Sequence, residues 1–239
     1  MGLGIRSRLL NKLLPHPATA DNAQYSMIFS AHDDKSFANE RLLELSLSAA
    51  KLASQISLKH ISSRMQCAPY YPDVWPGEHY KLLSALVRIM APKLVIEIGT
   101  YTGLSALAMR DALPADGRLI TFDIVPWNSL HDTVLVESDF TDGKLIQYTD
   151  DVTNAEGYNA LSGLFEQAEL IFIDAAKDFE MERRIVRLLS QTKFERSPIV
   201  VFDDIRLWPM LKLWRDIDRP KLDLTSFGHW SGTGLIDWS

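Results

Sequence analysis

The sequence from Val95 to Ser105 reads VIEIGTYTGLS. It begins as a mostly apolar run typical of a buried strand, and two glycines then bracket a short turn that opens a helical pattern. Glycines at the carboxyl end of a parallel strand let the backbone approach a ligand closely. The stretch therefore predicts the first strand and the ligand-binding turn of an α/β sheet.

Downstream of this turn, short apolar runs alternate with helical patterns, which is typical of parallel βαβ units with helices on both sheet faces. We expect strands at Leu94–Ile98, Leu119–Asp123, Leu145–Thr149, Leu170–Asp174 and Ile199–Asp203. We expect helices near Gly103–Ala112, Ala155–Gln167, Phe179–Gln191 and Trp208–Asp216. Two last runs, Leu222–Phe227 and Gly234–Trp238, predict a closing antiparallel hairpin. The fold class is a Rossmann-like, doubly wound, mostly parallel α/β sheet.

Upstream of the turn the pattern is helical. Leu and Ala recur at helical spacing from about Lys35 to Arg64, and another helix is expected at Glu78–Met90. A proline-rich loop, Ala68–Pro76, separates them, and the polar segment Pro15–Asp34 is expected to be a linker or an irregular arm. We therefore divide the chain into an N-terminal arm and helical extension, residues 1–75, and a main domain, residues 76–239.

Composition narrows the function classes. The 239 residues carry a formal net charge of −6, which argues against a nucleic-acid partner because a phosphate backbone requires clustered Lys and Arg. No apolar run approaches the roughly 20 residues that span a bilayer, so stable membrane insertion is not expected. The single cysteine, Cys67, excludes an intramolecular disulfide and fits a reducing compartment such as the cytoplasm.

Two acidic residues next to the glycine turn suggest the ligand. Glu97, inside the strand, suits an amino-bearing or cationic group, and Asp123, at the end of the next strand, suits a ribose diol. The glycine spacing differs from the G-x-G-x-x-G dinucleotide fingerprint, which argues against an NAD-dependent dehydrogenase. A nucleoside without a pyrophosphate is the expected ligand, although many Rossmann-like proteins carry an acid at the position of Asp123.

Carboxylates also end two later strands. Asp174 is followed by Lys177, and the other pair is Asp203 and Asp204. Strand ends of a doubly wound sheet open onto one crevice, where converging carboxylates repel one another unless a cation neutralises them. All-oxygen ligands suit Mg²⁺, Mn²⁺ or Ca²⁺. The alternatives are that the aspartates are solvated or cap a helix, and that Lys177 is a surface lysine.

The glycine turn resembles motif I of class I S-adenosylmethionine-dependent methyltransferases, in the E-I-G-T-Y-T-G-x-S form of the metal-dependent catechol and caffeoyl-CoA O-methyltransferases. The resemblance covers about Pro76 to Trp238. It implies that Asp123 binds the ribose and that Asp151 lies near the adenine. It also implies that the methionine end of the cofactor is lined by Glu97, Gly99, Tyr101 and Ser105.

The same resemblance implies roles for the later carboxylates. Asp174, Asp203 and Asp204 correspond to metal ligands, and Lys177 to the general base near the acceptor hydroxyl. Asp174 is thus expected to have three roles: it binds the cofactor, it takes part in catalysis together with Lys177, and it is a metal ligand. The chain departs from the family where Asp204 replaces the usual Asn, and the usual helix between Asp123 and Leu145 is hard to find.

The expected function is transfer of a methyl group from S-adenosylmethionine to a hydroxyl of a small acceptor, assisted by a divalent cation, with Mg²⁺ first and Mn²⁺ or Ca²⁺ as alternatives. The competing interpretations are a metal-independent methyltransferase acting on a sugar or natural product, and a non-catalytic Rossmann-like binding module. In the family the N-terminal extension caps the acceptor site or forms a dimer contact, so a homodimer stays open here.

Overall fold

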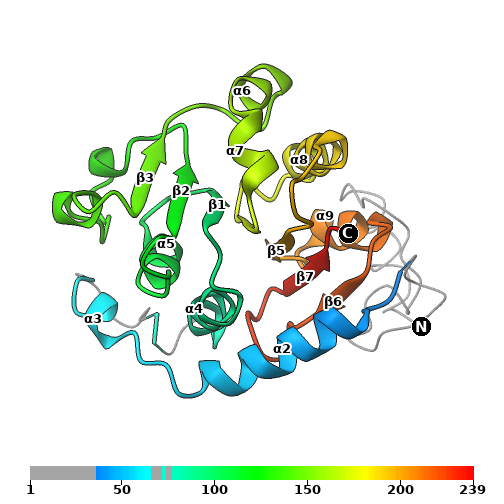
Figure 1. The fold of residues 1–239 in the computed structure, drawn as a ribbon, viewed down its shortest axis with the longest axis horizontal. Helices are drawn as coiled ribbons and strands as arrows, with labels where there is room; N and C mark the ends of the chain where they lie inside the picture. The colour runs from blue at the N-terminus through cyan, green and yellow to red at the C-terminus, as the bar shows by residue number, and fades with distance from the viewer. Residues whose placement is uncertain (1–35, 66–71, 74–76) are drawn as a thin grey trace, which may run out of the picture.

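A computed structural model describes residues 36–65, 72–73 and 77–239. Its strands are β1 (Leu94–Ile98), β2 (Arg118–Phe122), β3 (Leu145–Tyr148), β4 (Leu170–Ile173), β5 (Ile199–Asp203), β6 (Lys221–Asp223) and β7 (Thr233–Asp237). Within the described residues they form one seven-stranded sheet in the order β3-β2-β1-β4-β5-β7-β6 (Figure 1). The first five are parallel, and β7 runs antiparallel to both of its neighbours. The predicted fold class and closing hairpin are confirmed.

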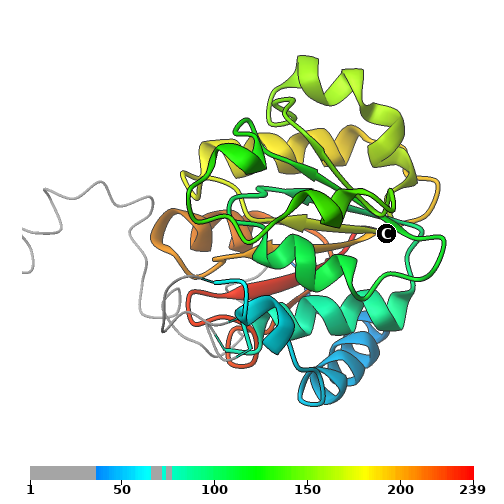
Figure 2. The same ribbon diagram turned by 90° about the vertical axis from the view of Figure 1, so that its left-hand side faces the viewer.

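Helices cover both faces of this sheet. They are α2 (Glu40–Ala53), α3 (Lys59–Ser62), α4 (His79–Met90), α5 (Leu104–Arg110), α6 (Ala155–Ala160), α7 (Ser162–Gln167), α8 (Glu180–Gln191) and α9 (Trp208–Asp216). One core lies between the sheet and α2, α4 and α5, and the other between the sheet and α6 to α9. Figure 2 shows the two helical layers on opposite sides of the strands.

Side-chain alternation along the strands explains the two cores. Neighbouring residues of a strand point to opposite faces, so Val95 joins the core with α4 and α5, and Ile96 joins the core with α8. All five residues of β1 are buried. A strand covered on both faces is mostly apolar, which explains the nearly continuous apolar runs in the sequence.

Two expected elements differ in extent. The helix expected at Ala155–Gln167 is divided into α6 and α7 at Leu161, whose φ of −118° is not helical. In the hairpin, β6 ends at Asp223 instead of reaching Phe227. Asp223 accepts hydrogen bonds from the Thr225 backbone N–H and hydroxyl, so the chain turns there and leaves the ladder.

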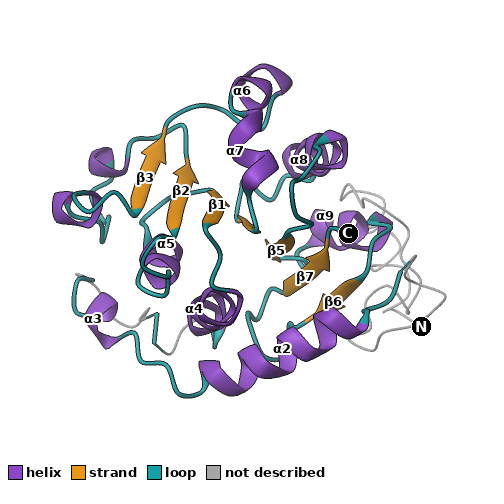
Figure 3. Cartoon of the chain, in the orientation of Figure 1, coloured by secondary structure: helices purple, strands orange, loops and turns teal. Residues whose placement is uncertain are grey.

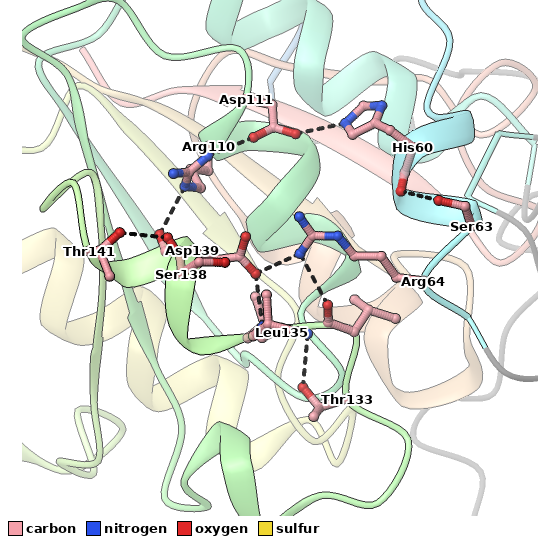
Figure 4. Close-up of polar contacts among 12 residues, drawn as sticks. His60, Ser63, Arg64, Arg110, Asp111, Thr133, Leu135, Ser138, Asp139 and Thr141 are labelled. Carbon is pink, nitrogen blue, oxygen red and sulfur yellow. Dashed lines mark hydrogen bonds and ion pairs between the residues drawn. The ribbon is translucent and has the colours of Figure 1, made fainter.

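The connection between β2 and β3 is mostly loop, with two short 3₁₀ turns, Trp127–Ser129 and Glu137–Phe140 (Figure 3). It is fixed by Asp139, which is 4% exposed and lies in the second of these turns. Asp139 accepts from the Val136 N–H at 2.9 Å and from Arg64 Nη1 at 2.6 Å (Figure 4). Arg64 lies just after α3, so the N-terminal extension holds this loop in place.

Only part of the N-terminal extension can be placed. Its helix α2 packs along α4, and Arg41 forms an ion pair with Asp237 of β7 at 2.7 Å. The expected arm at residues 15–34, Cys67 and most of the expected loop at residues 68–76 lie outside the described residues. Within the described ranges, no helix is both long enough and apolar enough to cross a membrane.

The Arg64–Asp139 contact leads to a stability prediction. Asp139→Asn removes the charged acceptor of two hydrogen bonds, and we expect it to lower the free energy of unfolding by about 1–2 kcal/mol. Urea unfolding followed by circular dichroism measures this change. The control is Asp132→Asn in the same loop, where the side chain is exposed and no effect is expected. Equal stabilities of the two variants would contradict the structural role of Asp139.

Candidate functional site

The glycine turn after β1 comes very close to the end of β4. Gly99 has a φ of +105°, and a Cβ atom there would lie 2.0 Å from the Asp174 carbonyl oxygen. Its N–H donates to the Phe122 carbonyl oxygen at 2.8 Å. Only glycine fits this position, because any side chain would collide with the neighbouring backbone. The close approach places the ends of β1, β2 and β4 around one crevice.

Glu97 is fully buried beneath this turn. Its Oε2 accepts a hydrogen bond from the Thr121 hydroxyl at 2.6 Å, and its Oε1 has no hydrogen-bond partner among the described residues. Burial raises the pKa of Glu97 to about 8. A buried carboxylate with a free acceptor oxygen suits a ligand that brings a positive charge or an N–H donor.

Asp123 lies just after β2 and organises the glycine turn. Its Oδ2 accepts from the backbone N–H groups of Thr100 at 3.1 Å and Tyr101 at 3.0 Å. Its Oδ1 accepts from the Val125 N–H at 3.0 Å. A carboxylate has about four acceptor positions, so one remains for a ligand.

A cavity of about 440 Å³ opens beside these groups. The predicted residues that line it are Gly99, Tyr101, Asp123, Asp151, Asp174 and Lys177. Glu97 and Ser105 are buried and do not belong to the lining. The sequence analysis missed the apolar wall, which consists of Ile98, Phe122, Ile124, Val152 and Met181. Ile98 and Phe122 are the last residues of their strands, and this strand-end position was the signal by which the sequence could have indicated that they line the cavity.

Asp151 forms the far side of this cavity. Its carboxylate accepts from the Thr153 N–H at 2.9 Å, from the Thr153 hydroxyl at 2.6 Å and from the Asn154 amide at 2.9 Å. The hydrogen bond from the Thr153 hydroxyl is the main reason that its pKa is lowered. Asp151 is therefore a fixed, ionised group at the rim.

Lys177 brings two predicted carboxylates together. Its ammonium contacts the Asp174 carboxylate and lies 3.2 Å from Asp204 Oδ2. It also donates to the Ala175 carbonyl oxygen at 3.0 Å. Although burial lowers it, the pKa of Lys177 is raised well above its usual value by Asp174, Asp203 and Asp204. The lysine is charged in this arrangement and acts as a counter-ion.

Asp203 and Asp204 gather with a histidine, His229, that was not among the predicted site residues. His229 Nδ1 lies 3.5 Å from Asp203 Oδ1 and 3.3 Å from Asp204 Oδ1. Donor atoms of the three residues lie within 4.8 Å of one another, and Asp174 is outside this group. His229 reaches the site on the connection between β6 and β7, and no short-range signal indicates this placement.

The electrostatics of the two aspartates differ. Burial raises the pKa of Asp203 well above its usual value, and the neighbouring carboxylates of Asp174 and Asp204 raise it further. For Asp204, burial has the same effect, but hydrogen bonds with His229, Ser231 and Lys177 hold its pKa below the usual value. The buried His79, 3.7 Å from Asp203 Oδ1, has its pKa lowered to about 3 by burial and by His229.

Backbone strain is concentrated at the same crevice. Among the described residues, five non-glycine residues have positive φ, and three of them are Tyr101 at 41°, Lys177 at 61° and Asp204 at 59°. Such conformations cost free energy and persist where the surrounding structure imposes them, often at functional sites. The strain supports a functional role for these three strand-end turns.

Known proteins share this architecture. Caffeoyl-CoA O-methyltransferase 1 of Zea mays is 27% identical over 176 residues, which cover 67% of this chain and 66% of that protein. The caffeoyl-CoA O-methyltransferase of Petroselinum crispum is 30% identical over 150 residues, 59% of this chain and 56% of that protein. The chain thus spans less than two thirds of the length of these relatives.

Solved structures share the fold at low sequence identity. The O-methyltransferase TomG of Streptomyces achromogenes, in complex with SAM, superposes with a TM-score of 0.52 at 15% identity over 89% of this chain and 100% of that chain. A putative caffeoyl-CoA O-methyltransferase from Staphylococcus aureus gives 0.53 at 14% identity over 82% and 100%.

A family model described as O-methyltransferase matches residues 45–213, which include α4, β1 to β5 and the glycine turn. The match covers more than half of the chain. The chain belongs to the O-methyltransferase family.

Proposed function

We propose that the protein transfers a methyl group from S-adenosylmethionine to a hydroxyl of a small acceptor. The observation that carries this proposal is the cavity at the ends of β1, β2 and β4, together with the buried Glu97 of β1, whose Oε1 has no hydrogen-bond partner among the described residues. Family membership supports it, as do relatives named for caffeoyl-CoA O-methylation. A small hydroxylated acceptor is the corresponding substrate class.

The residues around the cavity fit the cofactor. The apolar wall of Phe122, Val152 and Met181 suits the adenine ring, and Asp123 retains one acceptor position for a ribose hydroxyl. Glu97 would bind the amino group of the methionine end. Ser105, the second residue of α5, would act beside it, since its hydroxyl already lowers the pKa of Glu97.

The carboxylates next to the cavity fit a divalent cation. Asp203 is 5% exposed, and its Oδ1 has no hydrogen-bond partner in the described part of the chain. Asp203 and Asp204 would hold the ion, with Asp174 as the third ligand expected from the family. A bound cation would polarise the acceptor hydroxyl and lower its pKa. Mg²⁺, Mn²⁺ and Ca²⁺ all accept carboxylate oxygens.

In the reaction, Lys177 Nζ would take the proton of the acceptor hydroxyl while the oxygen attacks the sulfonium methyl group. A C–O bond forms, the C–S bond breaks, and its electron pair stays on sulfur. Lys177 must be neutral for this role, whereas Asp174 and Asp204 keep it charged here. Neutralising these carboxylates would remove the cause of its raised pKa. Asp174 positions the lysine through their contact.

A metal-independent methyltransferase is the second candidate. One observation favours it: Lys177 alone already bridges Asp174 and Asp204, so an ammonium can replace a cation as their counter-charge. Methyl transfer that persists unchanged after treatment with EDTA would select this candidate. A sugar or natural-product hydroxyl would then be the acceptor.

The ribose assignment predicts a ligand-specific effect of Asp123→Ala. The unaltered protein should bind S-adenosylhomocysteine at least about tenfold more tightly than it binds the analogue that lacks the hydroxyl contacted by Asp123. In the variant, the two ligands should bind equally. Calorimetry with the 2′-deoxy and 3′-deoxy analogues tests this. Each comparison is between two ligands on the same protein. Any loosening of the glycine turn by the substitution therefore affects both affinities alike and cancels in their ratio. If Asp123→Ala still bound the deoxy analogue as much more weakly than S-adenosylhomocysteine as the unaltered protein does, Asp123 would not be the ribose ligand.

The raised pKa of Glu97 predicts pH-dependent cofactor binding. Below pH 8 the free protein holds Glu97 protonated, and an ammonium group favours the carboxylate. Binding at pH 7 should therefore release a proton, and affinity should rise up to about tenfold per pH unit between pH 6 and 8. Calorimetry in buffers of different ionisation enthalpy measures both the number of protons released and the affinity at each pH. Glu97→Gln should bind weakly without proton release, and a flat profile for the unaltered protein would contradict the assignment.

Substitution of Lys177 should affect the chemical step. With an acceptor that the enzyme methylates, Lys177→Ala is expected to lower kcat about 100-fold or more, because general-base catalysis contributes on that order. The affinity for S-adenosylmethionine should change less than about threefold by the same reasoning. Lys193→Ala is the control, since that side chain is exposed. A fully active Lys177 variant would exclude it as the base.

A further inference from the structure

We infer that the cation site takes one nitrogen ligand, His229, together with Asp203 and Asp204, and that it therefore binds a transition ion such as Zn²⁺ in preference to Mg²⁺ or Ca²⁺. This inference rests on the proposed cation-assisted function and refines it. Imidazole is a ligand for zinc and other transition ions, whereas Mg²⁺ and Ca²⁺ select oxygen.

The donor atoms have the spacing of a coordination shell. In a tetrahedral site, ligand atoms about 2.1 Å from the ion are about 3.4 Å from one another. His229 Nδ1 lies 3.5 Å from Asp203 Oδ1 and 3.3 Å from Asp204 Oδ1. The three side chains thus need little rearrangement to surround an ion. The Ser231 hydroxyl contacts both Asp204 and His229 and helps to hold them in this arrangement.

A second observation points to a missing ligand at the same place. Asp203 Oδ1 has no hydrogen-bond partner in the part of the chain that the structure describes, although the residue is only 5% exposed. Two imidazoles approach this oxygen, with His79 Nδ1 at 3.7 Å and His229 Nδ1 at 3.5 Å. A buried carboxylate oxygen without a partner is costly unless a cation or a donor occupies its free position.

Asp174 is separated from this group by Lys177. Asp204 uses its two oxygens on different sides, with Oδ1 toward His229 and Ser231 and Oδ2 3.2 Å from Lys177 Nζ. The ammonium also contacts Asp174. Asp174 therefore serves the lysine, and His229 supplies the third ligand. This differs from the Asp174, Asp203 and Asp204 set expected from the sequence.

Metal titration of the full chain tests the inference. The protein is stripped with a chelator and titrated by calorimetry with Zn²⁺ and Mg²⁺. We expect His229→Ala to weaken Zn²⁺ binding at least tenfold and to change Mg²⁺ binding less than threefold. Asp174→Asn should change Zn²⁺ binding less than threefold. His131→Ala, which removes an exposed histidine away from the site, is the matched control and should have no effect.

X-ray absorption of the unaltered protein loaded with one equivalent of Zn²⁺ keeps the inference falsifiable if a variant fails to fold. Imidazole scattering is expected in its spectrum. An all-oxygen shell would overturn the inference, as would unchanged Zn²⁺ affinity in a folded His229→Ala variant. Titration of the same preparations with S-adenosylmethionine separates the failures. If the protein binds the cofactor but His229→Ala leaves Zn²⁺ affinity unchanged, only the claim of a nitrogen ligand is rejected. If the protein does not bind the cofactor, the proposed function is rejected.

Discussion

Mutual repulsion of neighbouring, partly buried carboxylates is the constraint on which the rest of the site depends. The parallel strands β4 and β5 are neighbours in the sheet, and both end on aspartates that face one crevice. Asp174, Asp203 and Asp204 cannot all be ionised there without a counter-charge. Lys177 supplies one positive charge, but its contacts are with Asp174 and Asp204, and Asp203 Oδ1 has no hydrogen-bond partner among the described residues. The remaining demand for positive charge is the physical basis for a cation beside the acceptor.

In the proposed cofactor cavity the polar groups are in a different state, since most of them already have hydrogen-bond partners within the protein. Asp123 fixes the glycine turn through two backbone amides, and Asp151 is held by Thr153 and Asn154. Such a pocket loses little conformational entropy on binding. Glu97 is the exception, because one of its oxygens has no hydrogen-bond partner in the part of the chain that the structure describes. The pocket is therefore rigid in shape and unsatisfied at the one point where the ligand is expected to bring charge.

The sequence predicted the parts of the structure that local pattern controls. The runs that became β1, β4 and β5 were recognisable because strands buried on both faces are mostly apolar. The strand-end positions of Gly99, Asp174 and Asp203 followed directly. The break at Leu161 was missed because helical periodicity continues across it. The lack of a regular helix before β3 was visible in the sequence, but the contact that holds this loop was not, since its anchor, Arg64, lies 75 residues before Asp139.

His229 shows the same limit at the site itself. It reaches Asp203 only because β7 pairs with β5 and the connection from β6 to β7 then lies over the strand end. Register between strands that are distant in sequence cannot be read from periodicity. The family resemblance did not help either, because it supplied a ligand set from strand ends alone.

The location of His229 on an edge connection has an evolutionary consequence. The glycine turn cannot be altered without a collision between Gly99 and the Asp174 backbone, so the cofactor pocket is fixed together with the centre of the sheet. The segment between β6 and β7 connects two antiparallel strands at one edge of the sheet. Exchange of this segment between homologues would replace His229, the proposed metal ligand, and leave the sheet intact. Metal preference can therefore diverge within the family while cofactor recognition is inherited unchanged.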